Sequence, residues 1–344
     1  MLETLQVIWF ILWALLWAVY FVLDGFDLGL GSLLPFIGSN EEERRIMYNA
    51  AGPFWDGNEV WLISAGGVTF AAFPKVYAVM FSALYAPLLI LLFALIFRAV
   101  AFEFRNKVNC GLWRGVWDTC LFLGNFVPAL LLGVAFANLF RGIPIDAEGV
   151  YQGNLFTLLN PYGLAGGLLF VIMFAYHGAL WLELKAEGPL QERAGRTAKA
   201  LWPLLLSLVL AFLALSAFYT DMYTSIAAHP VIYAALIVAV VGLVASRLAL
   251  ANGAMWTAWF MSSLFILGLT FFGAGSMFPS LIISSIDPSF SVTLANGSSS
   301  PLTLKIMLAV ALTAVPVVIL YQAWVYYTFS HKITAKELES EHAY

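Results

Sequence analysis

The sequence predicts an all-α integral membrane protein with nine transmembrane helices. Of its 344 residues, 62% are hydrophobic and only 10% are charged, and the mean hydropathy is +0.89. An average soluble domain has roughly 25% charged residues, so this chain lacks the polar surface that a water-soluble protein needs. Its apolar stretches are nearly continuous and show no alternation of apolar and polar residues. Helices are therefore expected rather than the strands of a membrane β-barrel.

Apolar stretches long enough to cross a hydrocarbon core of about 30 Å follow one another along the chain. The predicted spans cover residues 5–35, 54–73, 76–104, 115–140, 161–183, 200–220, 229–249, 255–279 and 304–329. The apolar run 248–286 is too long for one helix, and we expect it to break at Ala251-Asn252-Gly253. The polar segment 284–301 is expected to be an external loop. Gly25 and Gly29 form a GxxxG notch, which lets helices approach closely.

The basic residues predict which side of the membrane each end of the chain faces. The loops after the first, third, fifth and seventh spans, together with the C-terminal tail, hold Arg44, Arg45, Arg105, Lys107, Arg114, Lys185, Arg193, Arg196, Lys199, Arg247, Lys332 and Lys336. The opposite side holds only Lys75, Arg141 and Lys305. The positive-inside rule therefore places the N-terminus outside and the C-terminus in the cytoplasm.

Two classes of function are disfavoured by composition. The net charge of −4 and the scattered basic residues offer no surface for a nucleic acid. The two cysteines, Cys110 and Cys120, form no CxxC motif and no Cys/His spacing typical of a zinc site. Neither a disulfide framework nor a metal site is therefore indicated.

Ionisable residues inside or beside the spans are the main candidates for function, because such residues are costly in a membrane. They form three pairs with helical spacing, Asp24 and Asp27, Asp56 and Glu59, and Glu103 and Lys107, and Arg98 lies within the third span. All are placed near the cytoplasmic side, where grouped carboxylates beside cations can share protons. This pattern is compatible with a proton entry path. An alternative is structural: the second pair would offset the positive end of its helix, the third would be a solvated ion pair, and the first would bond to nearby backbone.

A single histidine lies in the middle of a span. His177 could in principle bind haem iron, but a lone intramembrane histidine is more often a hydrogen-bonded core residue. The other histidines, His229, His331 and His342, lie at a span end or in the tail. We therefore predict no haem ligand in this chain.

Several passages around these carboxylates resemble a known family. They are DGFDLGLG (24–31), ERRIMYNAAGPFWDGNEVWLISAGG (43–67), FAAFP (70–74), FRAVAFEFRNK (97–107), NFVPALLLGVAFANL (125–139) and GNLFTLLNPYGL (153–164). Together they resemble subunit II of cytochrome bd-type quinol oxidases. The resemblance is nearly continuous in the first half and weaker later, at 276–279 and at LYQAWVYY (320–327).

The resemblance implies two four-helix bundles plus a peripheral helix, in a bacterial cytoplasmic membrane protein. It also implies a pseudo-symmetric heterodimer with a haem-bearing subunit I, which holds haems b and d and the main quinol site, so that this chain ligates no cofactor. A structural quinone or lipid in this chain and a small single-helix accessory subunit stay open. By resemblance, Asp56, Glu103 and Lys107, with Asp27, Trp55 and Arg98 nearby, match a cytoplasmic proton route toward the oxygen-reducing haems. Asp24 and Glu59 are supporting residues, and the family also allows Asp at the position of Glu103.

Two other functions compete with proton delivery. A secondary transporter would use the acidic layer to couple protons to a solute, but such proteins usually have helices interrupted near the membrane midplane and inverted repeats. No such pair of interrupted spans is evident here. A scaffold that stabilises subunit I and conducts no protons remains an open alternative.

Overall fold

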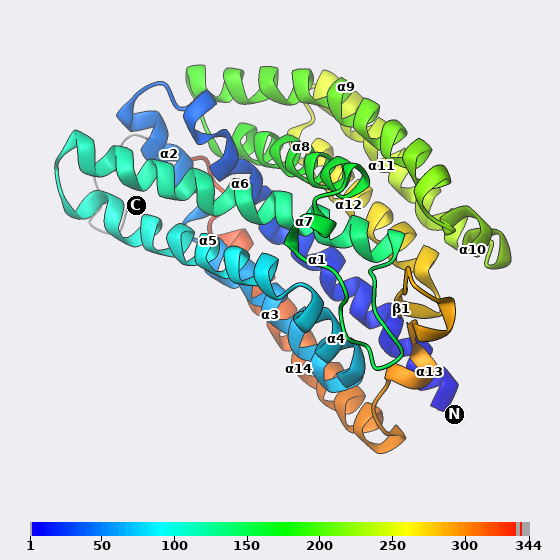
Figure 1. Cartoon of the computed structure of the whole chain (residues 1–344). Helices are drawn as coiled ribbons and strands as arrows, with labels where there is room; N and C mark the ends of the chain where they lie inside the picture. Colours follow the sequence, from blue (N-terminus) through cyan, green and yellow to red (C-terminus); the bar gives the residue numbers. More distant parts are fainter. Residues whose placement is uncertain (1, 335–337, 339–344) are drawn as a thin grey trace.

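The computed structural model describes residues 2–334 and residue 338, so Lys336 and His342 lie outside the described residues. The chain is almost entirely helical (Figure 1). Eight helices of the described part are long and apolar enough to cross a membrane. They are α1 (Leu2–Ile37), α5 (Tyr85–Phe104), α6 (Gly111–Arg141), α8 (Pro161–Lys185), α9 (Gly188–Tyr219), α11 (Ile232–Ala251), α12 (Met255–Met277) and α14 (Pro301–Thr328).

The second and third predicted spans differ most from the expectation. Residues 54–73 do form a helix, α3 (Trp55–Ala72), but it is not among the eight, since its first turns carry Asp56, Asn58 and Glu59. The third predicted span is wrong as a single helix: it is divided into α4 (Pro74–Ala83) and α5. Pro87 lacks the N–H that would bond to the Ala83 carbonyl, which explains a break here. The count of nine spans stays a prediction.

The break predicted between the seventh and eighth spans is confirmed. Helix α11 ends at Ala251, and Gly253 has a φ of 71°, a left-handed conformation that glycine adopts without steric cost. The N–H of Ala254 donates to the Ala249 carbonyl and the N–H of Gly253 to the Leu250 carbonyl. These two bonds are the Schellman pattern of a helix C-terminus.

Helix α1 is the central element and contacts α3, α6, α8, α12 and α14. Its GxxxG notch allows a very close approach to α8. A Cβ atom at Gly29 would lie 1.7 Å from the Phe174 carbonyl oxygen, and one at Gly25 would lie 2.8 Å from the Phe174 ring. On the facing helix, a Cβ at Gly178 would lie 2.5 Å from the Leu30 nitrogen. The predicted role of this notch in helix packing is confirmed.

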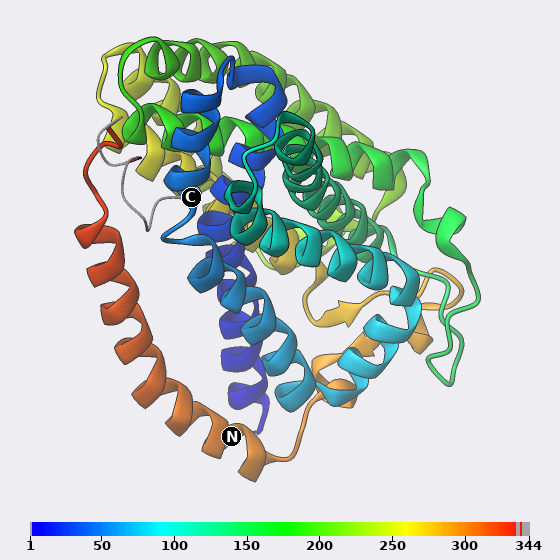
Figure 2. The ribbon, with the colours of Figure 1, turned by 90° about the vertical axis from the view of Figure 1, so that its left-hand side faces the viewer.

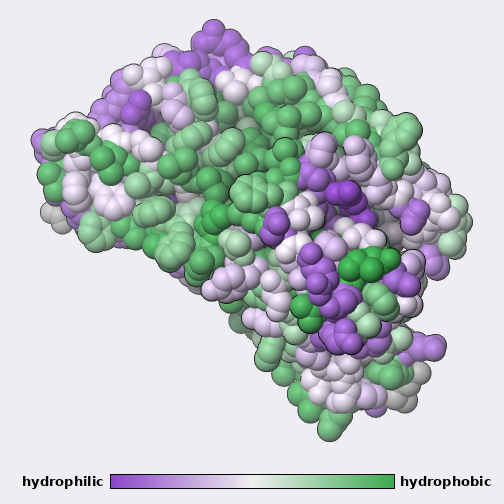
Figure 3. Space-filling view, viewed as in Figure 1, coloured by the Kyte–Doolittle hydropathy of each residue, from purple (hydrophilic) through white to green (hydrophobic). Residues whose placement is uncertain are grey.

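The two ends of the helical body are capped by short elements (Figure 1). At one end, α2 (Glu41–Ala51) lies in a stretch that the sequence analysis left outside any span; it begins at Asn40, whose side chain accepts from the Glu43 N–H. At the other end lie α7 (Leu155–Leu158), α10 (Met222–Ala228), β1 (Ser280–Ile282), η2 (Pro288–Phe290), β2 (Val292–Thr293) and α13 (Leu294–Gly297). The predicted external loop 284–301 thus contains ordered structure, with β2 paired antiparallel to β1. In Figure 3, hydrophobic residues cover the helices and hydrophilic residues gather at the two ends.

Helix α14 lies at the edge of the helical body (Figure 2), where it contacts α1 and α3. Of its residues only Leu304 is buried, so its surface is available to lipid or to a partner. The chain after α14 returns to the body, where the Lys185 ammonium donates to the backbone carbonyls of Phe329 and His331. The arrangement in two four-helix bundles plus a peripheral helix stays a prediction.

Candidate functional site

A buried arginine joins three helices inside the membrane-spanning body. The Nη1 atom of Arg98 (α5) lies 2.8 Å from Oδ1 of Asp24 (α1), and its Nη2 atom lies 2.8 Å from Oε2 of Glu59 (α3). The side chains of Arg98 and Asp24 are 0% exposed, whereas that of Glu59 is 23% exposed. The structural alternative predicted that Asp24 bonds to nearby backbone. No such bond is found among the described residues. The charge of Asp24 is compensated by an arginine from another helix.

Asp27 has a different partner. Nδ2 of Asn58 donates to Oδ2 of Asp27 at 2.7 Å and to the Leu23 carbonyl at 3.1 Å. The hydroxyl of Tyr326 donates to Oδ1 of Asn58 at 2.8 Å, which links α14 to α1 through α3. Gln322, one turn earlier on α14, adds a bond to the Gly57 carbonyl at 3.2 Å. The backbone alternative for Asp27 is thus wrong as well.

Asn58, Tyr326 and Gln322 are not among the site residues predicted from the sequence. Asn58 lies between Asp56 and Glu59 and is 0% exposed, so a polar amide inside a helix with two acidic residues was an available signal. Tyr326 and Gln322 follow Asn58 by more than 260 positions, and no local pattern indicated that they meet it.

Several polar atoms of this cluster have no hydrogen-bond partner among the described residues. They are Oδ2 of Asp24, Oδ1 of Asp27, the Tyr20 hydroxyl and Nε of Arg98. Buried polar groups in proteins are nearly always hydrogen-bonded, in many cases to ordered water. The cluster therefore offers acceptors and donors that suit water molecules between the helices.

The other three predicted proton-path residues are exposed. Asp56 lies in the first turn of α3, Glu103 is in the last turn of α5, and Lys107 ends the short helix η1 (Arg105–Lys107). No described residue forms an ion pair or hydrogen bond with any of the three side chains. The solvated Glu103–Lys107 pair of the structural alternative is absent from the described residues, because the α-helix ends at Phe104 and the i, i+4 spacing crosses its end.

Aromatic stacking joins α3, which carries Asp56, to α5, which carries Glu103. The rings of Trp55 and Phe102 stack with centroids 5.2 Å apart and an interplanar angle of 2°. Each ring is next in sequence to one of the exposed carboxylates, Asp56 and Glu103. The predicted residues therefore form two groups, a buried one around Arg98 and an exposed one at the adjoining ends of α3 and α5.

His177 is buried and uses both ring nitrogens. Nδ1 lies 3.0 Å from the Ser262 hydroxyl, and Nε2 lies 3.1 Å from the Val22 carbonyl. Its ring stacks on Trp259, with centroids 5.3 Å apart. In the described part of the chain, no group of three or more His, Cys, Asp or Glu side chains could hold a metal ion. These contacts favour a core role for His177.

A mostly apolar cavity of about 690 Å³ adjoins the buried cluster. It lies among α3, α4, α5 and α6, and Glu59 is the one charged residue among the described residues that line it. Trp17, Tyr77 and Phe136 are among the aromatic lining residues. A cavity of this size and composition suits a small apolar molecule or a lipid chain.

Residues 5–329 match the family model described as cytochrome bd terminal oxidase subunit II. The chain belongs to this family. It is 41% identical over 338 residues to cytochrome bd ubiquinol oxidase subunit 2 of Bacillus subtilis, covering 98% of this chain and 99% of that protein. It is 37% identical over 371 residues to cytochrome bd-I ubiquinol oxidase subunit 2 of Escherichia coli K12, covering 98% and 97%.

A solved structure has the same fold. The bd oxidase structure from Geobacillus thermodenitrificans contains a chain that superposes with a TM-score of 0.76 and 18% sequence identity, covering 94% of this chain and 97% of that one. The protein is therefore a multi-pass membrane subunit of a bacterial respiratory quinol oxidase, and subunit II implies a catalytic partner subunit.

Proposed function

We propose that this chain is the haem-free subunit II of a cytochrome bd-type quinol:O2 oxidoreductase, which stabilises subunit I and supplies it with protons from the cytoplasm. The observation that carries the proposal is the layering of carboxylates: an exposed group at the ends of α3 and α5 and a buried group around Arg98. The two groups are connected along α3, because Asp56, Asn58 and Glu59 lie within one helical turn.

The exposed group would receive protons first. Asp56 and Glu103 are exposed and have no competing ion pair among the described residues. A carboxylate that accepts a proton and then releases it needs this freedom. From these residues the proton would pass to the oxygen-reducing haems of subunit I across the face that the two subunits share.

The buried group would hold charge in place. Arg98 compensates Asp24 and Glu59, while Asp27 keeps one oxygen bonded to Asn58 and the other without a described partner. Asp27 is therefore the buried carboxylate that we assign to the proton route. Trp55 supports Asp56 by its stacking on Phe102.

The cofactors would be held by the partner subunit and not by this chain. Haems b and d and the main quinol site would lie in subunit I, with the N-terminus of this chain outside and its C-terminus in the cytoplasm. The apolar cavity beside Glu59 would take a lipid chain or a structural quinone. Expressed without subunit I, the chain should insert without haem, and a stoichiometric haem on the isolated chain would contradict the assignment and point to His177.

The test uses neutral variants of the exposed carboxylates in the whole complex. Asp56→Asn and Glu103→Gln keep size and hydrogen bonding but cannot exchange a proton. We expect full haem content and a loss of quinol-driven O2 consumption of at least about tenfold, equivalent to about 1.4 kcal/mol in the barrier. Glu42→Gln, an exposed carboxylate of α2 without a described contact, is the matched control and should consume O2 at the wild-type rate.

Two results would contradict proton delivery. Wild-type turnover in a fully assembled Asp56→Asn complex would exclude this residue as a carrier. Loss of haem or of subunit I from the variants would favour the alternative in which this chain is a scaffold that conducts no protons.

A further inference from the structure

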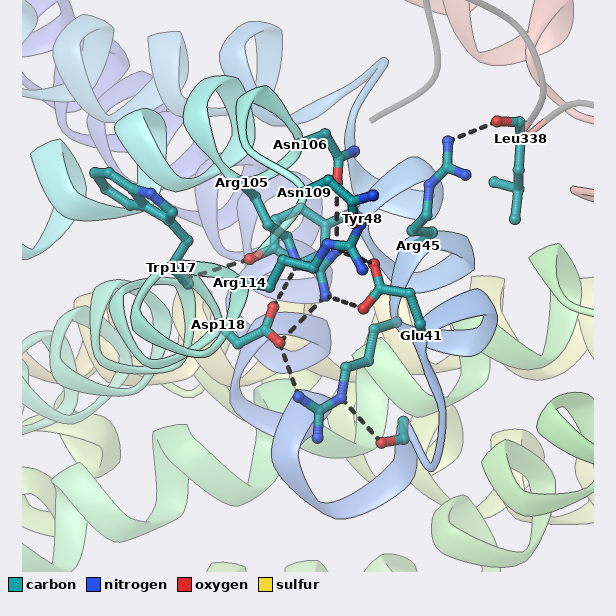
Figure 4. Close-up of polar contacts among 12 residues, drawn as sticks. Glu41, Arg45, Tyr48, Arg105, Asn106, Asn109, Arg114, Trp117, Asp118 and Leu338 are labelled. Carbon is teal, nitrogen blue, oxygen red and sulfur yellow. Dashed lines mark hydrogen bonds and ion pairs between the residues drawn. The ribbon is translucent and has the colours of Figure 1, made fainter. Parts of the chain in front are cut away.

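A second charge cluster, outside the proposed proton route, lies at the end of α5. Figure 4 shows that Glu41 of α2, Arg105 of η1 and Asp118 of α6 point toward one another. The Arg105 side chain is 0% exposed although it follows directly on the exposed residues of the α5 end. In the sequence, Arg105 is only one of the basic loop residues that predict the membrane topology.

All five N–H groups of Arg105 have acceptors. Its Nε and Nη2 atoms lie 2.6 Å and 3.2 Å from the two carboxylate oxygens of Asp118. Its Nη1 and Nη2 atoms lie 2.8 Å and 3.0 Å from the two oxygens of Glu41. The last N–H, on Nη1, reaches Oδ1 of Asn106 at 3.3 Å. A guanidinium bound bidentately by two carboxylates is held in both position and orientation, which a lysine ammonium cannot reproduce.

Arg105 and the two carboxylates that bind it, Glu41 and Asp118, are called the clamp below. Arg44 and Tyr48 add further contacts to it. Nη1 of Arg44 lies 2.8 Å from Oδ2 of Asp118, which leaves this carboxylate between two arginines. The Arg105 guanidinium stacks over the Tyr48 ring, 4.9 Å from its centroid. Removing Arg105 would leave Asp118, whose side chain is 10% exposed, with a single cation.

The position of the clamp relates it to the proposed route. Glu103 and Lys107 precede and follow Arg105 by two residues and are exposed, whereas Arg105 itself points inward. Tyr48 packs edge-on against Phe102 with centroids 5.5 Å apart, and Phe102 stacks on Trp55. A continuous set of contacts therefore runs from Arg105 to the residues next to Glu103 and Asp56.

We propose that Arg105, held by Asp118 and Glu41, is a positioning residue that sets the location of Glu103 and Lys107 and, through Tyr48, Phe102 and Trp55, of Asp56. The inference rests on the proposed proton route. Proton transfer depends steeply on the distance between donor and acceptor, and small misplacements of a reacting group can cost large factors in rate. A rigid anchor at this point would hold the two helix ends that carry the exposed carboxylates in a fixed relation to each other.

The experiment compares Arg105→Lys with Arg196→Lys in the complete oxidase. Arg105→Lys keeps the charge and removes the planar fork, whereas Arg196 is an exposed residue of α9 without a described contact. For Arg105→Lys we expect unchanged haem content and an unchanged quinol KM, because quinol binds mainly in subunit I. The kcat should fall by about tenfold at pH 7.5. The loss should grow toward pH 8.5, where protons are scarcer. Arg196→Lys should match the wild type.

The pH profile separates positioning from a purely structural role. A structural role would lower the amount of assembled complex and leave the pH profile of the assembled fraction unchanged. Glu41→Gln is the second variant: Glu41 is 40% exposed, so a neutral amide is tolerated there, and kcat should fall by a smaller factor with the same change in profile. If the Arg105→Lys complex does not assemble, the pH profile of Glu41→Gln distinguishes positioning from a purely structural role.

The outcomes distinguish this inference from the proposed function. Wild-type kcat and pH profile in an assembled Arg105→Lys or Glu41→Gln complex, together with a slow Asp56→Asn complex, would overturn the positioning role alone. Wild-type turnover in both Asp56→Asn and Glu103→Gln would overturn the proton route, and with it the role of the clamp.

Discussion

Replacing Arg98 by methionine tests how much the buried charge cluster stabilises this subunit. Methionine fills a similar length but leaves Asp24 buried without its cation. Breaking a fully buried ion pair by removing one partner costs about 3–5 kcal/mol. Glu59 is 23% exposed, so water compensates much of its charge and it adds about 1 kcal/mol or less. We therefore expect a loss of about 3–5 kcal/mol in the free energy of unfolding.

The measurement is the thermal stability of the purified complex, with the yield of assembled complex as a second readout. A second change, Asp24→Asn, removes the unpaired carboxylate and should restore a substantial part of the stability lost in Arg98→Met. Arg196→Met removes an exposed arginine and should stay within about 0.5 kcal/mol of the wild type. If Arg98→Met is as stable as the wild type, or if Asp24→Asn adds no recovery, the buried pair does not stabilise the protein as argued.

Three further predictions concern packing, exposure and pH. Gly29→Ala should strongly reduce assembly, because its Cβ would lie 1.7 Å from the Phe174 carbonyl oxygen, whereas Gly115→Ala, with no atom within 4 Å, should be tolerated; equal yields would contradict the close α1–α8 contact. Cys110 is exposed at the start of α6, where the backbone N–H groups of Trp113 and Leu112 lower the pKa of its thiol. A membrane-impermeant thiol reagent should therefore label it rapidly near pH 7.5 in inside-out vesicles but not in intact cells, with Cys110→Ser as the control; labelling from outside would reverse the proposed orientation. Burial raises the pKa of Glu43, but the hydrogen bond from Arg193 and the N–H groups of Ser39 and Asn40 outweigh it, so the net pKa lies below its ordinary value of 4.5. Its stabilisation is present above pH 4.5 and is lost as the pH falls through the lowered pKa, so Glu43→Gln should lower thermal stability at pH 7, by about 1 kcal/mol or less, with a difference that shrinks at acid pH.

The sequence by itself determined the class of protein and the positions of most helices. Hydrophobic length decides where a helix can cross a membrane, and this is a local property of the chain. The break at Ala251-Asn252-Gly253 was predictable for the same reason, because a glycine with a left-handed backbone ends a helix locally. The division of 76–104 into α4 and α5 also had a local signal in Pro87, which the sequence analysis did not use.

Only the tertiary structure decided which polar side chains meet. Helices that are apolar on most sides carry little pattern to indicate how they rotate about their axes, and that rotation selects the partner of each buried charge. For this reason the sequence identified Asp24, Glu59 and Arg98 as candidates but not as one ion-pair cluster, and it missed Asn58 and Tyr326. Arg105 shows the same limit: a charge counted for topology is buried because α2 and α6 bring two carboxylates to it.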